Sequence, residues 1–203
     1  MSTAAPLEPV VLTGSSVVLS IPGERDIDRI AELCREEAIS TWTTVPEPYT
    51  RADAESFVMG MVTRGWAQGT GCTWAIRREA RGTLVGMIGL DGIGDGEAEL
   101  GFWLAPDARG LGLMSQAVSL VIDFAFEPAA LGLQRVVWHA FTGNAASASV
   151  ARRAGFRFEG TRRLGGSQRG RRLDDWQAAL LATDAREPAA GWPEPTFVQR
   201  SPA

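Results

Sequence analysis

The segment from residue 97 to residue 140 constrains the fold most strongly. Residues 97–104 alternate as a strand does, and a turn containing Gly110 and Gly112 follows. Apolar residues then recur at helical spacing from about residue 112 to 127, and residues 133–140 form another strand-like run. A strand, a helix and a strand in this order form a crossover connection, so the pattern predicts an α/β protein.

Further elements alternate on either side of this crossover. The turn at 78–82 separates two short apolar runs and predicts a hairpin, and Thr50 followed by Asp53 is a helix-capping signal. The other strands are expected at 10–21, 72–77, 83–90, 156–162 and 173–182, and the other helices at 26–38, from 50 to about 62, and at 145–154. The total is about seven strands and four helices, with a proline-broken loop at 42–49.

The two ends of the chain differ from its middle. Residues 1–9 are small, polar and proline-containing, which predicts a flexible N-terminus, and four prolines after residue 184 predict a Pro-rich tail at 184–203. We expect one domain at 10–183 between them. The start lacks the features of a secretory signal, no apolar run approaches the ~20 residues of a membrane span, and the two cysteines form no disulfide framework. A cytoplasmic protein without membrane contact is therefore expected.

The composition excludes several enzyme classes. All 20 basic residues are arginine. The absence of lysine excludes a Walker A phosphate loop, a pyridoxal-phosphate Schiff base and the conserved lysine of protein kinases. One histidine and two distant cysteines cannot supply the usual ligands of a zinc site, so no metal is expected. A net charge of −4 and a pI of about 5.1 argue against duplex nucleic acid as a partner.

The turn before the helix at 112–127 has the local chemistry of a phosphate site. The N-terminus of a helix presents unpaired N–H groups and a positive dipole end, and glycines let an anion approach the backbone closely. Arg109 adds a fixed positive charge. A plain strand-to-helix turn would show the same residues. The dinucleotide fingerprint fits less well, because Ser115 stands where it needs glycine or alanine and no ribose-binding acid follows about 20 residues later.

Two linked motifs resemble the GCN5-related N-acetyltransferases (GNAT), and in particular their RimJ/RimL branch, which acetylates ribosomal proteins. Residues 109–114, Arg-Gly-Leu-Gly-Leu-Met, resemble the pyrophosphate-binding signature, with Met114 replacing a small residue. Residues 143–156, Gly-Asn-Ala-Ala-Ser through Gly-Phe, resemble the branch's second helix. The resemblance covers roughly residues 10–183. It implies a mixed, mostly antiparallel sheet that splays between its fourth and fifth strands.

The resemblance also implies where acetyl-CoA binds as cosubstrate. Its pantetheine arm would lie along the open edge of the strand at 97–104, with a backbone N–H near Trp103 or Leu104 polarising the thioester carbonyl. Asn144 would cap the second helix and contact pantetheine. The pyrophosphate would lie on the loop formed by Arg109, Gly110, Leu111, Gly112, Leu113, Met114 and Ser115.

Two catalytic residues follow from the resemblance. Glu99 stands at the carboxylate position that serves as a base in some family members, although it could be a structural carboxylate. Ser147, three residues after Asn144, is the candidate donor to the leaving thiolate, although it could be a small residue on an exposed turn. The tyrosine that many members place seven residues after this asparagine is Ala151 here. His139 is interpreted as a core or edge residue, with substrate contact as the alternative.

These observations predict an acyltransferase that moves an acetyl group from acetyl-CoA to a primary amine by direct attack on the thioester. The acceptor could be a protein N-terminus, an aminoacyl-nucleotide antibiotic or a polyamine, and the loops at 38–50 and 163–172 would select it. The alternative is a catalytically weak acyl-CoA-binding sensor or interaction module with the same fold. A homodimer is expected from the resemblance.

Overall fold

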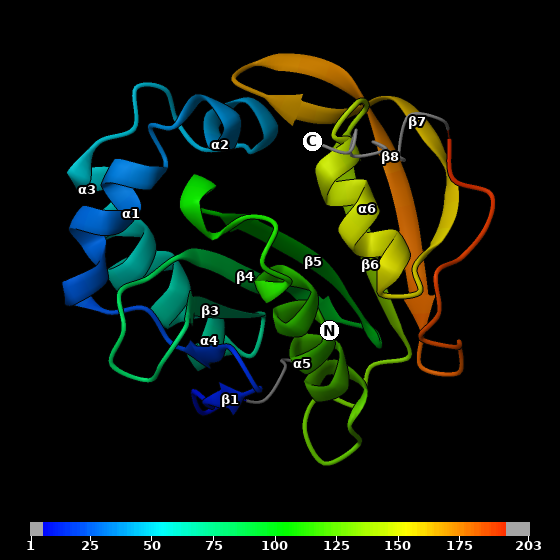
Figure 1. Cartoon of the computed structure of the whole chain (residues 1–203), viewed down its shortest axis with the longest axis horizontal. Coiled ribbons are helices and arrows are strands. Elements are labelled where there is room, and N and C mark those ends of the chain that lie inside the picture. Colours follow the sequence, from blue (N-terminus) through cyan, green and yellow to red (C-terminus); the bar gives the residue numbers. More distant parts are fainter. Residues whose placement is uncertain (1–5, 194–203) are drawn as a thin grey trace.

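The computed structural model describes residues 6–193, so residues 1–5 and 194–203 of the two expected terminal segments lie outside the described part. Its centre is an eight-stranded sheet in the order β1-β2-β3-β4-β5-β6-β8-β7 (Figure 1). The strands are β1 (Leu12–Thr13), β2 (Val18–Ser20), β3 (Gly71–Arg77), β4 (Gly86–Gly94), β5 (Glu97–Leu104), β6 (Arg135–Phe141), β7 (Arg157–Gln168) and β8 (Arg171–Leu181). All pairs are antiparallel except β5 with β6.

The predicted α/β class and mostly antiparallel sheet are confirmed. The first predicted strand, 10–21, is instead two short strands, because the chain turns back on itself between Thr13 and Val18. The side chain of Gln116 supports this turn by accepting hydrogen bonds from the Ser15 hydroxyl and the Ser16 amide. The seventh expected strand therefore becomes the eighth.

The helical elements are α1 (Ile27–Leu33), α2 (Glu37–Trp42), α3 (Arg51–Glu55), the π-helical stretch η2 (Ser56–Val62), α4 (Thr63–Gln68), α5 (Leu113–Phe126) and α6 (Ala145–Arg153), with 3-10 turns at Glu24–Asp26 and Pro106–Ala108. The single helix expected at 26–38 is wrong: it ends at Leu33, and Glu36 adopts an extended conformation before α2 begins. The Thr50 capping box is confirmed, because its hydroxyl accepts from the Asp53 amide.

The parallel pairing of β5 with β6 is short. Only Glu97, Ala98 and Glu99 pair with β6, opposite Arg135, Val136 and Val137. Beyond these residues the two strands diverge, which confirms the predicted splay between the fourth and fifth expected strands. The crossover helix α5 and the following α6 lie on the near side of the sheet in Figure 1.

Aromatic side chains join the layers of the core. Trp74 on β3 packs edge-to-face against Trp66 of α4 and against Phe124 of α5, with ring centroids 5.1 and 5.6 Å apart. Cys34 is buried among apolar residues, as predicted, and burial raises the pKa of its thiol to about 12. No helix within residues 6–193 is long and apolar enough to cross a membrane.

The C-terminal segment returns to the sheet after β8. The Trp192 side chain is 6% exposed, its indole N–H donates to the Phe156 carbonyl, and its ring lies 5.5 Å from that of Trp138. Gly155 makes room for this segment, since a Cβ there would lie 2.7 Å from the Ala185 carbonyl oxygen. The segment therefore packs against the part of β6 that leads into the splay.

Candidate active site

The loop before α5 has the backbone geometry of an anion site. Gly110 and Gly112 have φ values of +76° and +77°, a region that glycine enters without strain, and Gly112 is the N-cap of the 14-residue helix α5. The first N–H groups of such a helix, here those of Leu113, Met114 and Ser115, have no intrahelical partner. Among residues 6–193, apart from Gly112 and its two chain neighbours, no heavy atom lies within 4 Å of an ideal Cβ at Gly112, so a negatively charged group has room to approach these amides.

The side chains of this loop have divided roles. Arg109 Nε donates to the Leu104 carbonyl oxygen over 3.1 Å, which fixes the loop to the end of β5. Leu111 is 53% exposed, whereas Met114 is 7% exposed and belongs to the hydrophobic core. The bulky residue at the position of the signature's small residue therefore points away from the loop surface and leaves the amides accessible.

The register of β5 determines which of its main-chain groups face the gap. The Arg135 amide donates to the Gly96 carbonyl, so the main-chain groups of even-numbered β5 residues point toward β6. The Ala105 amide donates to Val85 on the opposite side, which is consistent with this alternation. Of the two expected thioester-polarising donors, Leu104 therefore has its N–H toward the open edge, and Trp103 has its N–H toward β4.

A cleft of about 400 Å³ occupies the splay. It brings together Glu99, Asn144 and Ser147, three of the residues singled out from the sequence, while Trp103, Leu104 and the loop at 109–115 do not line this volume. Its other walls come from the end of α2 and the chain after it, from β6 and from the β7–β8 hairpin. These walls include Trp42, Thr43, Thr44, Trp138, His139, Phe141, Arg162, Gly165, Gly166, Ser167 and Asp175.

The charged end of the cleft centres on Glu99. Its carboxylate oxygen Oε2 lies 3.1 Å from Nδ1 of His139, and the two side chains are 50% and 17% exposed. Arg162 lies close enough for Glu99 to raise the pKa of its guanidinium, although its hydrogen bond to Asp175 contributes more. The carboxylate of Asp175 is buried and holds Arg162 through two hydrogen bonds. This end of the cleft therefore holds a carboxylate and an imidazole in direct contact.

The opposite wall carries a hydroxyl at the start of α6. The Asn144 side chain caps this helix by accepting from the Ser147 amide over 3.2 Å, as the sequence predicts. The indole N–H of Trp138 donates to Ser147 Oγ over 3.0 Å. Because the oxygen is accepting this bond, the hydroxyl proton is available to a group in the cleft. Ala151 is fully buried, so this position of α6 faces the core.

A clasp of hydrogen bonds roofs the cleft. The tip of the β7–β8 hairpin reaches toward α2 at the top of Figure 1, where Gln168 Nε2 donates to the carbonyls of Thr41 and Thr43 over 2.9 and 2.7 Å. Arg169 donates to the Ser40 carbonyl over 2.7 Å and pairs with Glu47 over 2.8 Å. Both loops expected to select the acceptor thus contribute to one roof.

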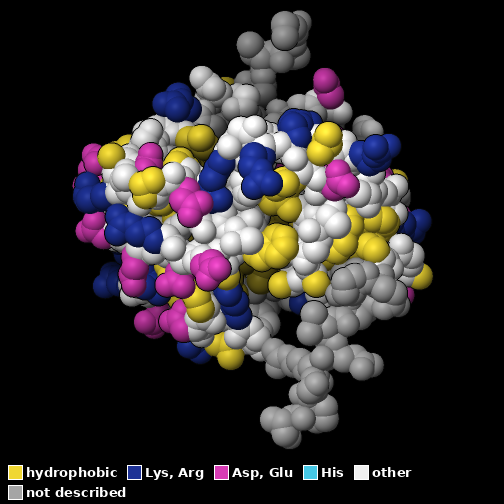
Figure 2. All heavy atoms as spheres, turned by 90° about the horizontal axis from the view of Figure 1, so that it is seen from above, with side chains coloured by type: hydrophobic (Ala, Val, Ile, Leu, Met, Phe, Trp, Pro, Cys, Tyr) yellow, Lys and Arg dark blue, Asp and Glu magenta, His cyan; other side chains and the backbone are white. Residues whose placement is uncertain are grey.

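The face seen from above has an uneven charge distribution. Figure 2 shows acidic side chains gathering on its left, which is the side of α1 and α3 in Figure 1. Asp28, Glu32 and Glu55 belong to these helices, and their side chains are 84%, 65% and 56% exposed. These carboxylates pair with Arg29 and Arg51, and basic side chains lie among them in Figure 2, but residues 24–55 carry nine acidic residues against four arginines, so this side has a net negative charge.

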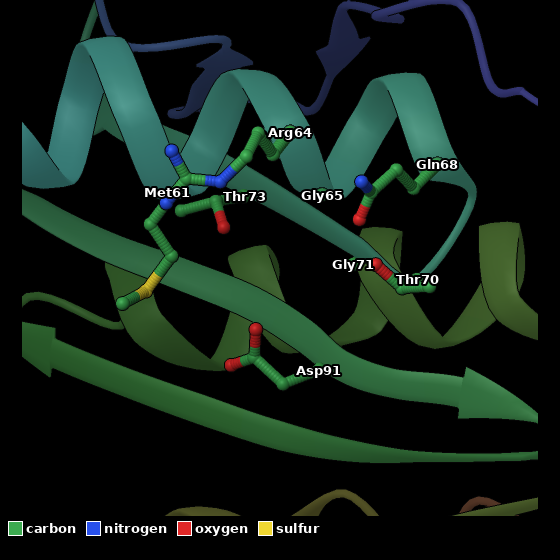
Figure 3. A pocket seen from close by; sticks show the side chains of 8 residues that line it. All are labelled: Met61, Arg64, Gly65, Gln68, Thr70, Gly71, Thr73 and Asp91. Carbon is green, nitrogen blue, oxygen red and sulfur yellow. The ribbon is translucent and has the colours of Figure 1, made fainter.

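A second, smaller pocket of about 190 Å³ adjoins the cleft at Asp91 (Figure 3). Asp91 stands directly opposite Glu99 in the pairing of β4 with β5, so both carboxylates lie on one face of the sheet. Desolvation raises the pKa of the Asp91 carboxyl, and repulsion from Glu99 raises it further. Arg64, Gln68, Thr70 and Thr73 line the rest of this pocket, with Met61, Gly65 and Gly71.

The geometry has its counterpart among known proteins. A family model described as an acetyltransferase (GNAT) domain matches residues 17–157. The chain belongs to the GNAT acetyltransferase family. It is 32% identical over 146 residues to a Bacillus subtilis (strain 168) protein named as a ribosomal N-acetyltransferase, YdaF, covering 70% of this chain and 78% of that protein.

Solved GNAT structures share the fold. A GCN5-related N-acetyltransferase from Brucella melitensis is 25% identical with a TM-score of 0.72, covering 90% of this chain and 83% of its own. RimL, a ribosomal L7/L12 alpha-N-protein acetyltransferase solved in complex with coenzyme A, is 20% identical with a TM-score of 0.74, covering 85% of this chain and 98% of its own.

Three groups in the cleft were not expected as site residues from the sequence. Trp138 bonds Ser147, Asp91 opposes Glu99, and His139 contacts Glu99. Strand alternation places His139 on the same face as Val137, but the pairing of Val137 with Glu99, which brings His139 beside the carboxylate, depends on the register of β5 with β6. The neighbours of Asp91 and Trp138 likewise depend on the sheet register and on the position of α6.

Proposed function

We propose that this protein is an acetyl-CoA-dependent N-acetyltransferase that acts on a primary amine. The observation that carries the proposal is the cleft in the splay, which places the Glu99 carboxylate on one wall and the Ser147 hydroxyl on another. Transfer from a thioester to an amine needs a proton acceptor for the amine and a donor for the departing sulfur. The cleft offers both between the same two strands.

The residues around the splay fit acetyl-CoA as the acyl donor. The glycine turn and the N-terminus of α5 suit its pyrophosphate, and the open edge of β5 at Phe102 and Leu104 suits main-chain pairing with pantetheine. Bound there, acetyl-CoA supplies an activated acetyl group. We assign polarisation of the thioester carbonyl to the Leu104 N–H, a role that places a fixed donor where negative charge develops.

Ser147 and Glu99 then act at the two ends of the bond exchange. The Ser147 hydroxyl, already accepting from Trp138, donates to the sulfur as negative charge develops there. The attacking amine gives up a proton at the Glu99 end of the cleft. Neither step requires a metal ion or a covalent enzyme intermediate.

For the acceptor we propose a positively charged primary amine that enters beneath the clasp. The net negative charge of residues 24–55 would attract it, and the end of α2 with the β7–β8 hairpin would contact its remainder. The name of YdaF favours a protein N-terminus. Polyamines and aminoacyl nucleotides also carry primary amines and are the alternative acceptors. A cytoplasmic homodimer with a single domain at 10–183 stays a prediction.

A turnover assay tests the proposal. Purified protein is supplied with acetyl-CoA and a panel of amines that includes N-terminal peptides of ribosomal proteins, polyamines and aminoacyl nucleotides, and release of free thiol is measured. We expect amine-dependent thiol release with at least one class. Tight acetyl-CoA binding without thiol release on every amine would instead favour the acyl-CoA-binding sensor, whose main support is Ala151 in place of the family's tyrosine.

A further inference from the structure

His139 occupies a special place in the splay. Val137 is the last β6 residue that pairs with β5, and it pairs with Glu99. His139 lies two residues further along β6, where a strand advances by about 3.3 Å per residue, so it stands in the open part of the gap. Its side chain is mostly buried yet lines the cleft. The ring therefore lies beyond the last parallel pair and lines the same cleft as Glu99 and Ser147.

The contact between His139 and Glu99 involves one specific ring nitrogen. Nδ1 lies 3.1 Å from Glu99 Oε2. This is an ion-pair contact rather than a hydrogen bond, but a carboxylate oxygen at this distance repels a lone pair on Nδ1, so the proton of a neutral imidazole is favoured on Nδ1 and the lone pair on Nε2. Within residues 6–193, no protein group forms a hydrogen bond with Nε2.

The other charged groups around His139 are occupied. On β7, the Glu159 carboxylate accepts from Arg135 and from Gln177, which stands opposite His139 on β8. Arg162 on β7 is held by Asp175 on β8. On β4, Asp91 faces Glu99 from the far side and does not reach the imidazole through any hydrogen bond or ion pair in the described chain. Glu99 is thus the side chain that orients the ring.

We propose that His139, through Nε2, is the group that takes the proton from the attacking amine, and that Glu99 is a positioning residue that orients His139 and stabilises its protonated form. The proposal rests on the proposed function and refines its acid–base step. The ammonium first gives one proton to Nε2; the neutral nitrogen then forms a bond to the carbonyl carbon, the carbon–sulfur bond breaks, and the nitrogen releases its second proton to solvent. The sulfur leaves as a thiolate held by Ser147, and the imidazolium returns its proton to solvent through the cleft.

Elementary acid–base chemistry supports this division of roles. A free imidazole has a pKa of about 6.5 and a glutamate carboxyl about 4.3, so an imidazole accepts a proton more readily near neutral pH while remaining mostly unprotonated. A carboxylate behind an imidazole holds its tautomer and balances the charge that forms on it. The 3.1 Å contact places the carboxylate where it can balance the charge of an imidazolium.

One experiment reads the tautomer without any turnover. The chain contains a single histidine, so protein labelled with 15N-histidine gives one set of imidazole signals. We expect the unprotonated-nitrogen signal from Nε2 in the wild-type protein at pH 8, and a shift toward the other tautomer in Glu99→Gln. A wild-type ring protonated on Nε2 would overturn the proposal, whether or not an acceptor has been found.

The second experiment compares pH–rate profiles with one good acceptor. His139→Gln should lower kcat/KM by about 10²-fold to 10⁴-fold and abolish the acid limb, with partial recovery at high pH where free amine is abundant. Glu99→Gln should lower kcat/KM less, on the order of 10-fold to 10²-fold, and should keep the acid limb, because the imidazole that takes the proton is still present.

Controls separate this outcome from general damage. Glu97→Gln makes the same chemical change two residues away on the same face, where the side chain bonds Arg135 instead, and should leave the profile unchanged. Added imidazole should restore part of the activity of His139→Ala. If Glu99→Gln loses the acid limb while His139→Gln keeps it, Glu99 is the base and the proposal is wrong. If the wild-type protein acetylates no amine, the proposed function fails, and the tautomer still reports on the dyad.

Discussion

The two ends of the splay present different chemical groups to the gap. At the donor end, between β5 and α5, the groups that face the gap are main-chain amides and glycines, and the side chains of Arg109 and Met114 support them from outside or below. At the acceptor end the groups are side chains, and Glu99, His139, Arg162 and Asp175 come from four strands. The donor end therefore suits one invariant ligand, while the acceptor end can change with single substitutions.

The largest effect is expected at the donor end, where a negative charge added to the glycine turn should weaken acetyl-CoA binding. Gly112→Asp places a carboxylate beside the N-terminus of α5, and two like charges 4 Å apart near a protein surface repel by about 4 kcal/mol. We expect acetyl-CoA affinity to fall by about 10³-fold in calorimetry. Gly112→Asn is the matched control, because asparagine has the same shape without the charge and also tolerates positive φ. Equal affinities of the two variants would refute the pyrophosphate assignment.

Ser147 lies between the two ends, and its loss should affect turnover rather than binding. Removing one donor to a developing charge costs on the order of 10-fold to 10³-fold, so we expect Ser147→Ala to lower kcat within this range. The affinity for acetyl-CoA should barely change, because the sulfur of the thioester carries no charge. Ser149→Ala is the control, since that hydroxyl lies on the same helix and bonds Arg153. Wild-type kcat in Ser147→Ala would rule out its role as donor.

The clasp offers a milder test of the acceptor end. Arg169→Ala removes the bonds from the hairpin tip to Ser40 and Glu47, so the roof should loosen. We expect KM for the amine to rise by about 3-fold to 10-fold, a loss of ~1 kcal/mol in keeping with partly exposed charged contacts, while KM for acetyl-CoA stays constant. Arg171→Ala, two residues away at the start of β8, should change neither. An equal rise in both KM values would show that the roof serves the whole site.

Asp91 should give the smallest effect, and it should appear in stability. The raised pKa means that the folded state disfavours the ionised carboxyl, so Asp91 lowers stability progressively as pH rises above its ordinary value. Asp91→Asn should therefore raise Tm slightly at pH 8. The difference should vanish below about pH 4, where the carboxyl is protonated in both the folded and unfolded states. A lower Tm for the variant at pH 8 would contradict the unfavourable pairing with Glu99.

The contrast between the two ends also explains what could be predicted. The crossover, the Asn144 cap and the buried Cys34 follow from periodicity or capping chemistry, because each depends on residues close together in sequence, whereas the splay was expected only from the family resemblance. The helix break after Leu33 and the split first strand could not be predicted, since contacts from distant segments decide them. Gln116 supports the first turn from about 100 residues away.

The same reasoning applies to individual site residues. The positions of Glu99 and Ser147 in one cleft agree with the expectation from the motifs, while their catalytic roles stay predictions. The environment of His139 required the register of β5 with β6, and that of Asp91 required the pairing of β4 with β5. The choice of Leu104 over Trp103 as the open-edge amide also depends on register, which a run of alternating residues leaves open by one position.

Trp192 connects the segment after β8 to the proposed active site. Its ring packs against that of Trp138, and the indole N–H of Trp138 donates a hydrogen bond to Ser147 Oγ. A protein truncated after β8 would keep every side chain that lines the cleft but would lose Trp192, which packs against Trp138. The support of the Ser147 hydroxyl thus extends beyond Leu181, the end of β8, to a side chain that does not line the cleft.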